Sequence, residues 1–226
     1  MVLKRFLLVA LLTVCPVVAN TILVTGVDSS LGLQQSIYLN ENGAPTQIYW
    51  AGAIDISVDG YTRLVYCVDL FTDIYLATTY NTTMDFADTP NLQRVGWLLQ
   101  NQVPVNQVQG AALQLAIWDI MEDNGNGFGA GSVAQSTDLA NPTNPAVLLL
   151  AQQYETVSAG QSSTSGIVYH NVTLNGTTVQ TLMGTSTTVH NDGGPSPNPE
   201  PATLILILGG LVMIAVSRLR RGTNPR

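Results

Sequence analysis

Lysine is absent from most of this chain, and cysteine is nearly absent. Of its 226 residues, eight are lysine or arginine, but only Arg63 and Arg94 lie between positions 20 and 198. Fourteen acidic residues lie in the same stretch, which gives it a net charge of −12. A surface of this charge repels nucleic acid and anionic lipid headgroups. The composition therefore excludes a nucleic-acid partner for this stretch.

Signatures of several enzyme classes are absent as well. The sequence has no glycine-rich phosphate loop, no G-x-S-x-G motif and no cysteines and histidines clustered at metal-ligand spacing. Asp119, Glu122 and Asp123 precede the run Asn124-Gly125-Asn126-Gly127, but they lack the alternating ligands and the terminal glutamate of a calcium loop. We predict no catalytic residues of these classes, no metal and no cofactor.

The N-terminus has the pattern of an export signal. Lys4 and Arg5 precede an apolar stretch over residues 6–14, and small residues end at Ala19. We predict a signal peptide over residues 1–19. Lipidation at Cys15 is the weaker alternative, because Val14 is bulky where that signal needs a small residue.

The C-terminus has the pattern of a membrane anchor. Residues 191–201 are rich in glycine and proline and predict an extended linker. An apolar run over 202–217 is marginally long enough for a transmembrane helix. Arginines within 218–226 predict a cytoplasmic tail by the positive-inside rule.

This tail resembles the bacterial PEP-CTERM sorting signal. The sorting motif Pro199-Glu200-Pro201, the short apolar run and the terminal arginines occur in the order that the signal requires. The resemblance implies processing by an exosortase-type enzyme of a Gram-negative bacterium. It also implies a membrane-anchored precursor, released to the cell surface or to an exopolysaccharide matrix.

Residues 20–190 are long enough for one domain with a core. Apolar alternation and turn residues predict strands, capping residues predict three helices, and Asp59-Gly60 predicts a hairpin. This order predicts an α+β fold, with a β-sandwich or barrel-like framework and an inserted helical subdomain. The expected strands cover 21–27, 36–39, 54–58, 61–71, 166–174 and 178–188; the helices start after Thr89, Asn106 and Asn144.

Cys67 is the one thiol left after removal of the signal peptide. An unpaired cysteine in an oxidising compartment needs a reason to exist. It could simply be a small buried residue, although alternation puts it on one face with Arg63 and Asp69, which argues against simple core packing. We expect the neighbouring Tyr66 to be a core residue and Asp69 to be solvated.

Two motifs suggest a second reason. Tyr66-Cys67-Val68 is followed by Leu113-Gln114-Leu115-Ala116-Ile117-Trp118, and together they resemble the two signatures of thioester domains in bacterial surface adhesins. The resemblance implies a bond between the sulfur of Cys67 and the side-chain carbonyl of Gln114. It implies that an amine, expected to be lysine, on a surface protein or matrix component then attacks this bond and becomes covalently attached. Trp118, four residues after Gln114, could shield the thioester from water or simply pack in the core.

Two other functions remain open. A noncovalent structural or polysaccharide-binding matrix protein would keep the sorting signal and make Cys67 incidental. A cysteine-dependent acyl-transfer enzyme would need a histidine base beside Cys67. His170 is the candidate, because the other histidine, His190, borders the linker.

Overall fold

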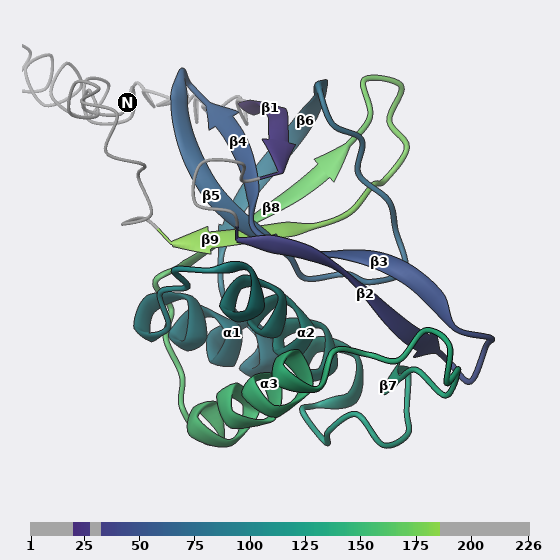
Figure 1. Ribbon diagram of the computed structural model, residues 1–226. Helices are drawn as coiled ribbons and strands as arrows, with labels where there is room; N and C mark the ends of the chain where they lie inside the picture. The colour runs from purple at the N-terminus through teal and green to yellow at the C-terminus, as the bar shows by residue number, and fades with distance from the viewer. Residues whose placement is uncertain (1–19, 28–32, 186–226) are drawn as a thin grey trace, which may run out of the picture. The chain divides into compact units, whose positions relative to one another are not determined.

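A computed structural model describes residues 20–27 and 33–185, which belong to the first of two compact units of the chain, Met1–His190. Figure 1 shows the arrangement of nine strands and three helices in this part of the chain. The elements are β1 (Asn20–Val27), β2 (Gln34–Glu41), β3 (Gln47–Gly52), β4 (Ile54–Val58), β5 (Tyr61–Cys67), β6 (Thr78–Phe86), α1 (Pro90–Asn101), α2 (Gln107–Asp123), β7 (Val133–Gln135), α3 (Pro145–Ser158), β8 (Gly166–Val172) and β9 (Leu182–Thr185).

Six strands form a closed barrel in the order β1-β4-β5-β9-β8-β6. The barrel closes because β1 pairs antiparallel with β4 on one side and with β6 on the other. The strands that follow the helices, β8 and β9, belong to the same barrel because β8 pairs with β6 and β9 pairs with β5. Closure leaves the barrel without an open edge.

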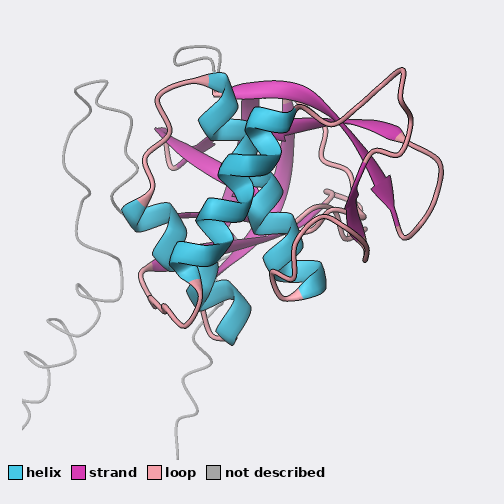
Figure 2. Cartoon of the chain, turned by 60° about the horizontal axis from the view of Figure 1, so that its bottom comes forward, coloured by secondary structure: helices cyan, strands magenta, loops and turns pink. Residues whose placement is uncertain are grey.

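The other three strands form a separate sheet in the order β3-β2-β7. Figure 2 shows the three helices packed together over the strands. Helix α2 contacts both other helices as well as β2, β3, β5 and β7, and α1 packs on β8 and β9. The helices therefore join the two sheets through one shared core.

The predicted fold class is wrong. The described chain is mostly β, with a closed barrel and a second small sheet, and its helices share the core of the strands instead of forming an inserted subdomain. The fold class was mispredicted because it depends on which strands pair, and alternation within a strand does not say which strand lies beside it. Among the residues described, no helix has both the length and the apolar character to cross a membrane. The predicted transmembrane helix at 202–217 lies outside the described residues, as do the signal peptide, the linker and the basic tail.

Local signals placed most of the boundaries correctly. The predicted turn between β4 and β5 is confirmed, with positive φ angles at both Asp59 and Gly60, as a two-residue hairpin requires. The three predicted helix starts are also confirmed. The side chains of Thr89, Asn106 and Asn144 each accept a backbone N–H of the first turn.

Helix α2 is buried almost all round, from Gly110 to Ile120. It approaches the chain before β2 so closely that a Cβ atom on Gly110 would lie 2.0 Å from the carbonyl oxygen of Leu33. Only glycine fits at this contact. The contact fixes the position of α2 along its own axis relative to the strands. It thereby also fixes the position of Gln114, one helical turn after Gly110.

A polar cluster holds the three helices together at the far end of α2. The guanidinium of Arg94 donates to the carbonyl oxygens of Glu155 and Asn124 and to the hydroxyl of Ser158. The carboxyl groups of Asp119 and Glu155 also lie at this end, and burial raises the pKa of both. Desolvation, followed by the charge of Asp119, raises the pKa of Glu155 to about 8, so Glu155 keeps its proton at neutral pH.

This pair predicts a loss of stability as the pH rises. An unfolded Glu155 loses its proton near its ordinary pKa of 4.5, whereas the folded protein holds the proton up to about 8. The stabilisation is therefore complete below the unfolded pKa and is lost between the two values. We expect the free energy of unfolding, measured in urea, to fall by on the order of a few kcal/mol over this range because of Glu155.

Glu155→Gln supplies the matched control, because its carboxamide can donate to Asp119 without titrating. The difference between the two proteins cancels the contribution of the remaining acidic surface. The variant should lose this part of the pH dependence and exceed the parent in stability at pH 8. An unchanged pH profile would show that the folded protein does not keep Glu155 protonated.

Candidate functional site

Cys67 is the last residue of β5, at a point where the barrel pairing is incomplete. On one side it lies opposite Leu182 of β9. On the other side β4 pairs with β5 only as far as the Ile54–Val65 pair. The next residue, Val68, donates its N–H to Thr181 on the β9 side. Because peptide groups alternate along a strand, those of Cys67 face the side that β4 has left.

The side chain of Gln114 fills this position. The backbone N–H of Cys67 donates to Gln114 Oε1 at 3.0 Å, and Gln114 Nε2 donates to the backbone oxygen of Cys67 at 2.7 Å. The carboxamide thus replaces a peptide group of the missing strand. Cys67 is 6% exposed and Gln114 is 1% exposed, so both bonds are formed away from water. The two residues that the sequence selected are therefore in direct contact.

The surroundings of Cys67 favour the neutral thiol. Burial raises the pKa of the thiol well above its ordinary value, and the negative charge of Asp69 raises it further. The argument from alternation against core packing of Cys67 is wrong, because both faces of β5 are covered at this end and Cys67 belongs to the core. Asp69 is partly buried rather than fully solvated. Tyr66 is a core residue, as predicted.

The polar side chains of Asp69, Gln180 and Asn171 hold the segment that follows Cys67. Asp69 accepts hydrogen bonds from the N–H of Phe71 and the hydroxyl of Thr72. Gln180 Nε2 donates to the backbone oxygen of Asp69 at 2.6 Å, and Asn171 Nδ2 donates to the backbone oxygen of Gln180 at 3.0 Å. The sequence analysis missed Gln180 and Asn171. Their signal was a polar residue within an apolar β-like run, which is ambiguous without the neighbouring strand.

Trp118 is buried on α2, one turn after Gln114. Its ring meets Tyr49 of β3 edge-on, with centroids 6.2 Å apart and an angle of 65° between the planes. This contact makes Trp118 part of the core between α2 and the second sheet. Its role as a wall of a thioester site stays a prediction.

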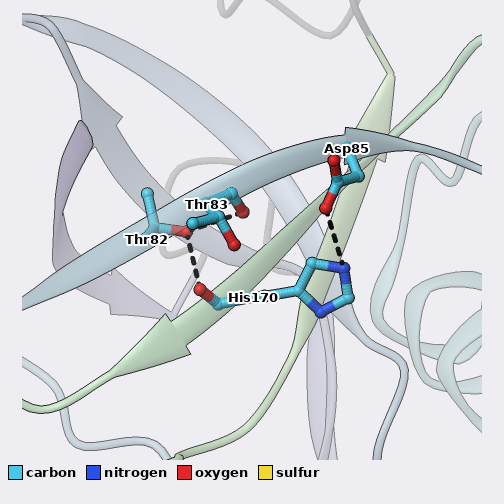
Figure 3. Close-up of polar contacts among 4 residues, drawn as sticks. All are labelled: Thr82, Thr83, Asp85 and His170. Atoms are coloured by element: carbon cyan, nitrogen blue, oxygen red, sulfur yellow. Dashed lines mark hydrogen bonds and ion pairs between the residues drawn. The ribbon is translucent and has the colours of Figure 1, made fainter. Parts of the chain in front are cut away.

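His170 lies away from Cys67, on an outward-facing position of β8. The side chain is half exposed, and its Nε2 lies 3.6 Å from Asp85 Oδ2 on the neighbouring strand β6, as Figure 3 shows. Tyr169, the residue before it, faces the core and lies opposite Leu182, which in turn lies opposite Cys67. His170 is therefore two strands away and on the other face of the barrel wall.

The remaining features considered in the sequence are the acidic residues at the end of α2 and the sorting motif. Within residues 20–27 and 33–185, no three metal-ligating side chains come together to hold an ion. The carboxylates of Asp119 and Asp123 instead accept the backbone N–H groups of Gly127 and Val133. The sorting motif Pro199-Glu200-Pro201 lies outside the described residues.

Comparison of the chain with protein-family models, with curated proteins and with solved structures gave no match.

The contact between Cys67 and Gln114 predicts a large effect of removing the carboxamide. Gln114→Leu leaves a buried N–H and a buried carbonyl of Cys67 without partners, so we expect the free energy of unfolding to fall by about 2–4 kcal/mol. Gln114→Glu should be tolerated better, because a protonated carboxyl can accept from the N–H and donate to the carbonyl. Chemical denaturation of both variants at pH 6 checks this. Equal stabilities would contradict the bonding pattern.

Proposed function

We propose that this protein is an exported surface or matrix protein in which Cys67 and Gln114 form an internal thioester that captures an amine on a partner. The main support is the pair of buried hydrogen bonds between the Cys67 backbone and the Gln114 carboxamide. They hold an electrophilic carbonyl beside the residue that carries the thiol, on a strand and a helix whose own positions are fixed by packing.

Formation of the bond is an acyl transfer without an external reagent. The sulfur of Cys67 adds to the Gln114 carbonyl carbon, the C–N bond breaks, and the thiol proton leaves with the nitrogen as ammonia. The N–H that donates to Gln114 Oε1 would stabilise the negative charge on that oxygen in the tetrahedral intermediate. A donor placed in advance matters here, because an amide is a poor electrophile and burial disfavours the thiolate.

Capture of the partner breaks the thioester, with Cys67 as the leaving group. A primary amine attacks the thioester carbonyl, the Cys67 thiol is released with its proton, and Gln114 becomes joined to the partner through an amide bond. Burial of both residues would keep water from the thioester until the amine arrives. The described chain contains no lysine, so a second copy cannot supply a competing side-chain amine from these residues. The acidic surface would also attract a basic partner.

Delivery of the protein forms the second half of the proposal. The signal at residues 1–19 and the sorting motif Pro199-Glu200-Pro201 support export, followed by processing by an exosortase-type enzyme. The destination would be the surface or the matrix of a Gram-negative bacterium. Lysine-bearing proteins and amine-bearing matrix components are the expected partners there.

A noncovalent structural role is the second candidate. The Gln114 carboxamide satisfies two buried backbone groups at the end of β5, which is a sufficient structural reason for a glutamine there. In that case Cys67 would be a small core residue with a free thiol. The polysaccharide-binding form of this candidate rests on the sorting signal alone.

Intact-mass measurement separates the two candidates. We expect the purified chain to be lighter than its sequence by the mass of one ammonia. Methylamine should add across the bond, which raises the mass above that of the sequence by one methylene group, and should free one thiol for alkylation after denaturation. A full-mass chain whose thiol is alkylated after denaturation without methylamine would reject the thioester.

Two conservative variants serve as controls for the mass measurement. Cys67→Ser and Gln114→Glu should each retain the fold, since serine is close to cysteine in size and glutamate can replace both hydrogen bonds. Both should show full mass. A mass deficit that persists in either variant would place the lost ammonia elsewhere in the chain.

His170 tests the cysteine-enzyme alternative. Because the side chain points away from Cys67 and contacts Asp85, His170→Ala should leave the mass deficit and the rate of methylamine addition unchanged. A loss of both in a folded variant, monitored by circular dichroism, would show that His170 acts on Cys67 and would revive the enzyme alternative.

A further inference from the structure

Strand β3 forms an edge of the second sheet. It pairs with β2 along one side, and among the described residues no strand pairs with its other side. The barrel has no such edge, and the opposite edge of this sheet, β7, has only three residues. Figure 1 shows the β2–β3 hairpin extending away from the barrel. An edge strand presents unpaired peptide groups that another strand can bind.

Hydrogen bonds at the two ends of the sheet fix which peptide groups face this edge. The N–H of Ala53 donates to Leu33, and the N–H of Asn42 donates to Ser132 on the β7 side. The peptide groups of successive residues face alternate sides of a strand, and counting from either hydrogen bond gives the same assignment. Gln47, Tyr49 and Ala51 turn their peptide groups towards β2, so Ile48 and Trp50 turn theirs towards the open edge.

The side chains of the same two residues are exposed. Ile48 is 59% exposed and Trp50 is 68% exposed, on the face opposite Tyr49 and its contact with Trp118. Natural edge strands are usually protected by charges, prolines or bulges. The stretch from Asn42 to Ile54 contains no charged residue, in a chain with a net charge of −12 between positions 20 and 198. The edge thus has both the backbone and the side chains of a pairing surface.

We propose that β3 pairs antiparallel with β3 of a second copy of this chain, with Tyr49 opposite Tyr49 of the other copy. In this register Ile48 of each copy lies opposite Trp50 of the other copy. The N–H and C=O groups of these residues, which face the edge, then all have hydrogen-bonding partners. The strand is therefore complementary to itself about a two-fold axis. The absence of charge also favours self-association through this surface, because two acidic copies repel each other elsewhere.

The expected dimer is weak, because a six-residue strand buries less than a standard protein interface. Sedimentation velocity of the purified full chain should show a dimer fraction that rises with concentration. Trp50→Lys and Ile48→Glu should each weaken association by about tenfold or more, because each places a charge opposite an apolar residue of the other copy. The double variant should recover association, because each new Glu then lies opposite a new Lys.

Phe86→Lys is the matched control. Phe86 is an exposed aromatic residue (70%) on β6, a strand that has neighbours on both sides in the barrel. This variant should associate like the parent, and circular dichroism should show that all variants are folded. A parent that stays monomeric, an equal loss in Phe86→Lys, or a double variant no better than the single ones would each overturn the proposal.

Discussion

One side-chain carboxamide connects helix α2 to the barrel of this protein. In the barrel wall, β4 pairs with β5 only as far as Val65, so the backbone of Cys67 has no partner strand on that side. The side chain of Gln114 from α2 supplies the missing hydrogen bonds. Both groups are buried, so neither could turn to water if the other moved. The helix and the barrel must therefore keep a fixed position relative to each other. The proposed chemistry uses this same constraint, since an acyl transfer to a buried thiol depends on fixed geometry more than on thiol acidity.

The rest of the core keeps α2 in place for this contact. Gly110 allows the helix to lie against the chain at Leu33, and the Tyr49–Trp118 contact joins it to the second sheet. At its C-terminal end the guanidinium of Arg94 links α2 to α3 through the carbonyl oxygens of Asn124 and Glu155. These contacts have different chemistry, but each restricts the sliding of α2 along its own axis. Gln114 lies between them.

The sequence predicted local structure well and assembly poorly. Caps at Thr89, Asn106 and Asn144 and the Asp59-Gly60 turn depend on residues that are neighbours in the chain, and all four predictions are confirmed. Three strands, β3, β6 and β7, were missed: β3 and β6 have many exposed or partly exposed residues, and β7 has only three residues. The Cys67–Gln114 contact was found because each residue had its own motif. The residues that support it, Gln180 and Asn171, had none.

The end of the described chain has a mechanical consequence. The last strand, β9, pairs directly with β5 at Tyr66 and Cys67. Tension that enters from the chain beyond Thr185, and is resisted by a partner attached at Gln114, would pass through β9 and the end of β5 and then across to α2. Strand β9 also pairs with β8, so part of the load would pass into the other side of the barrel. Such a tether would distribute force from one short strand to both of its neighbours and to the helix that bears the new bond.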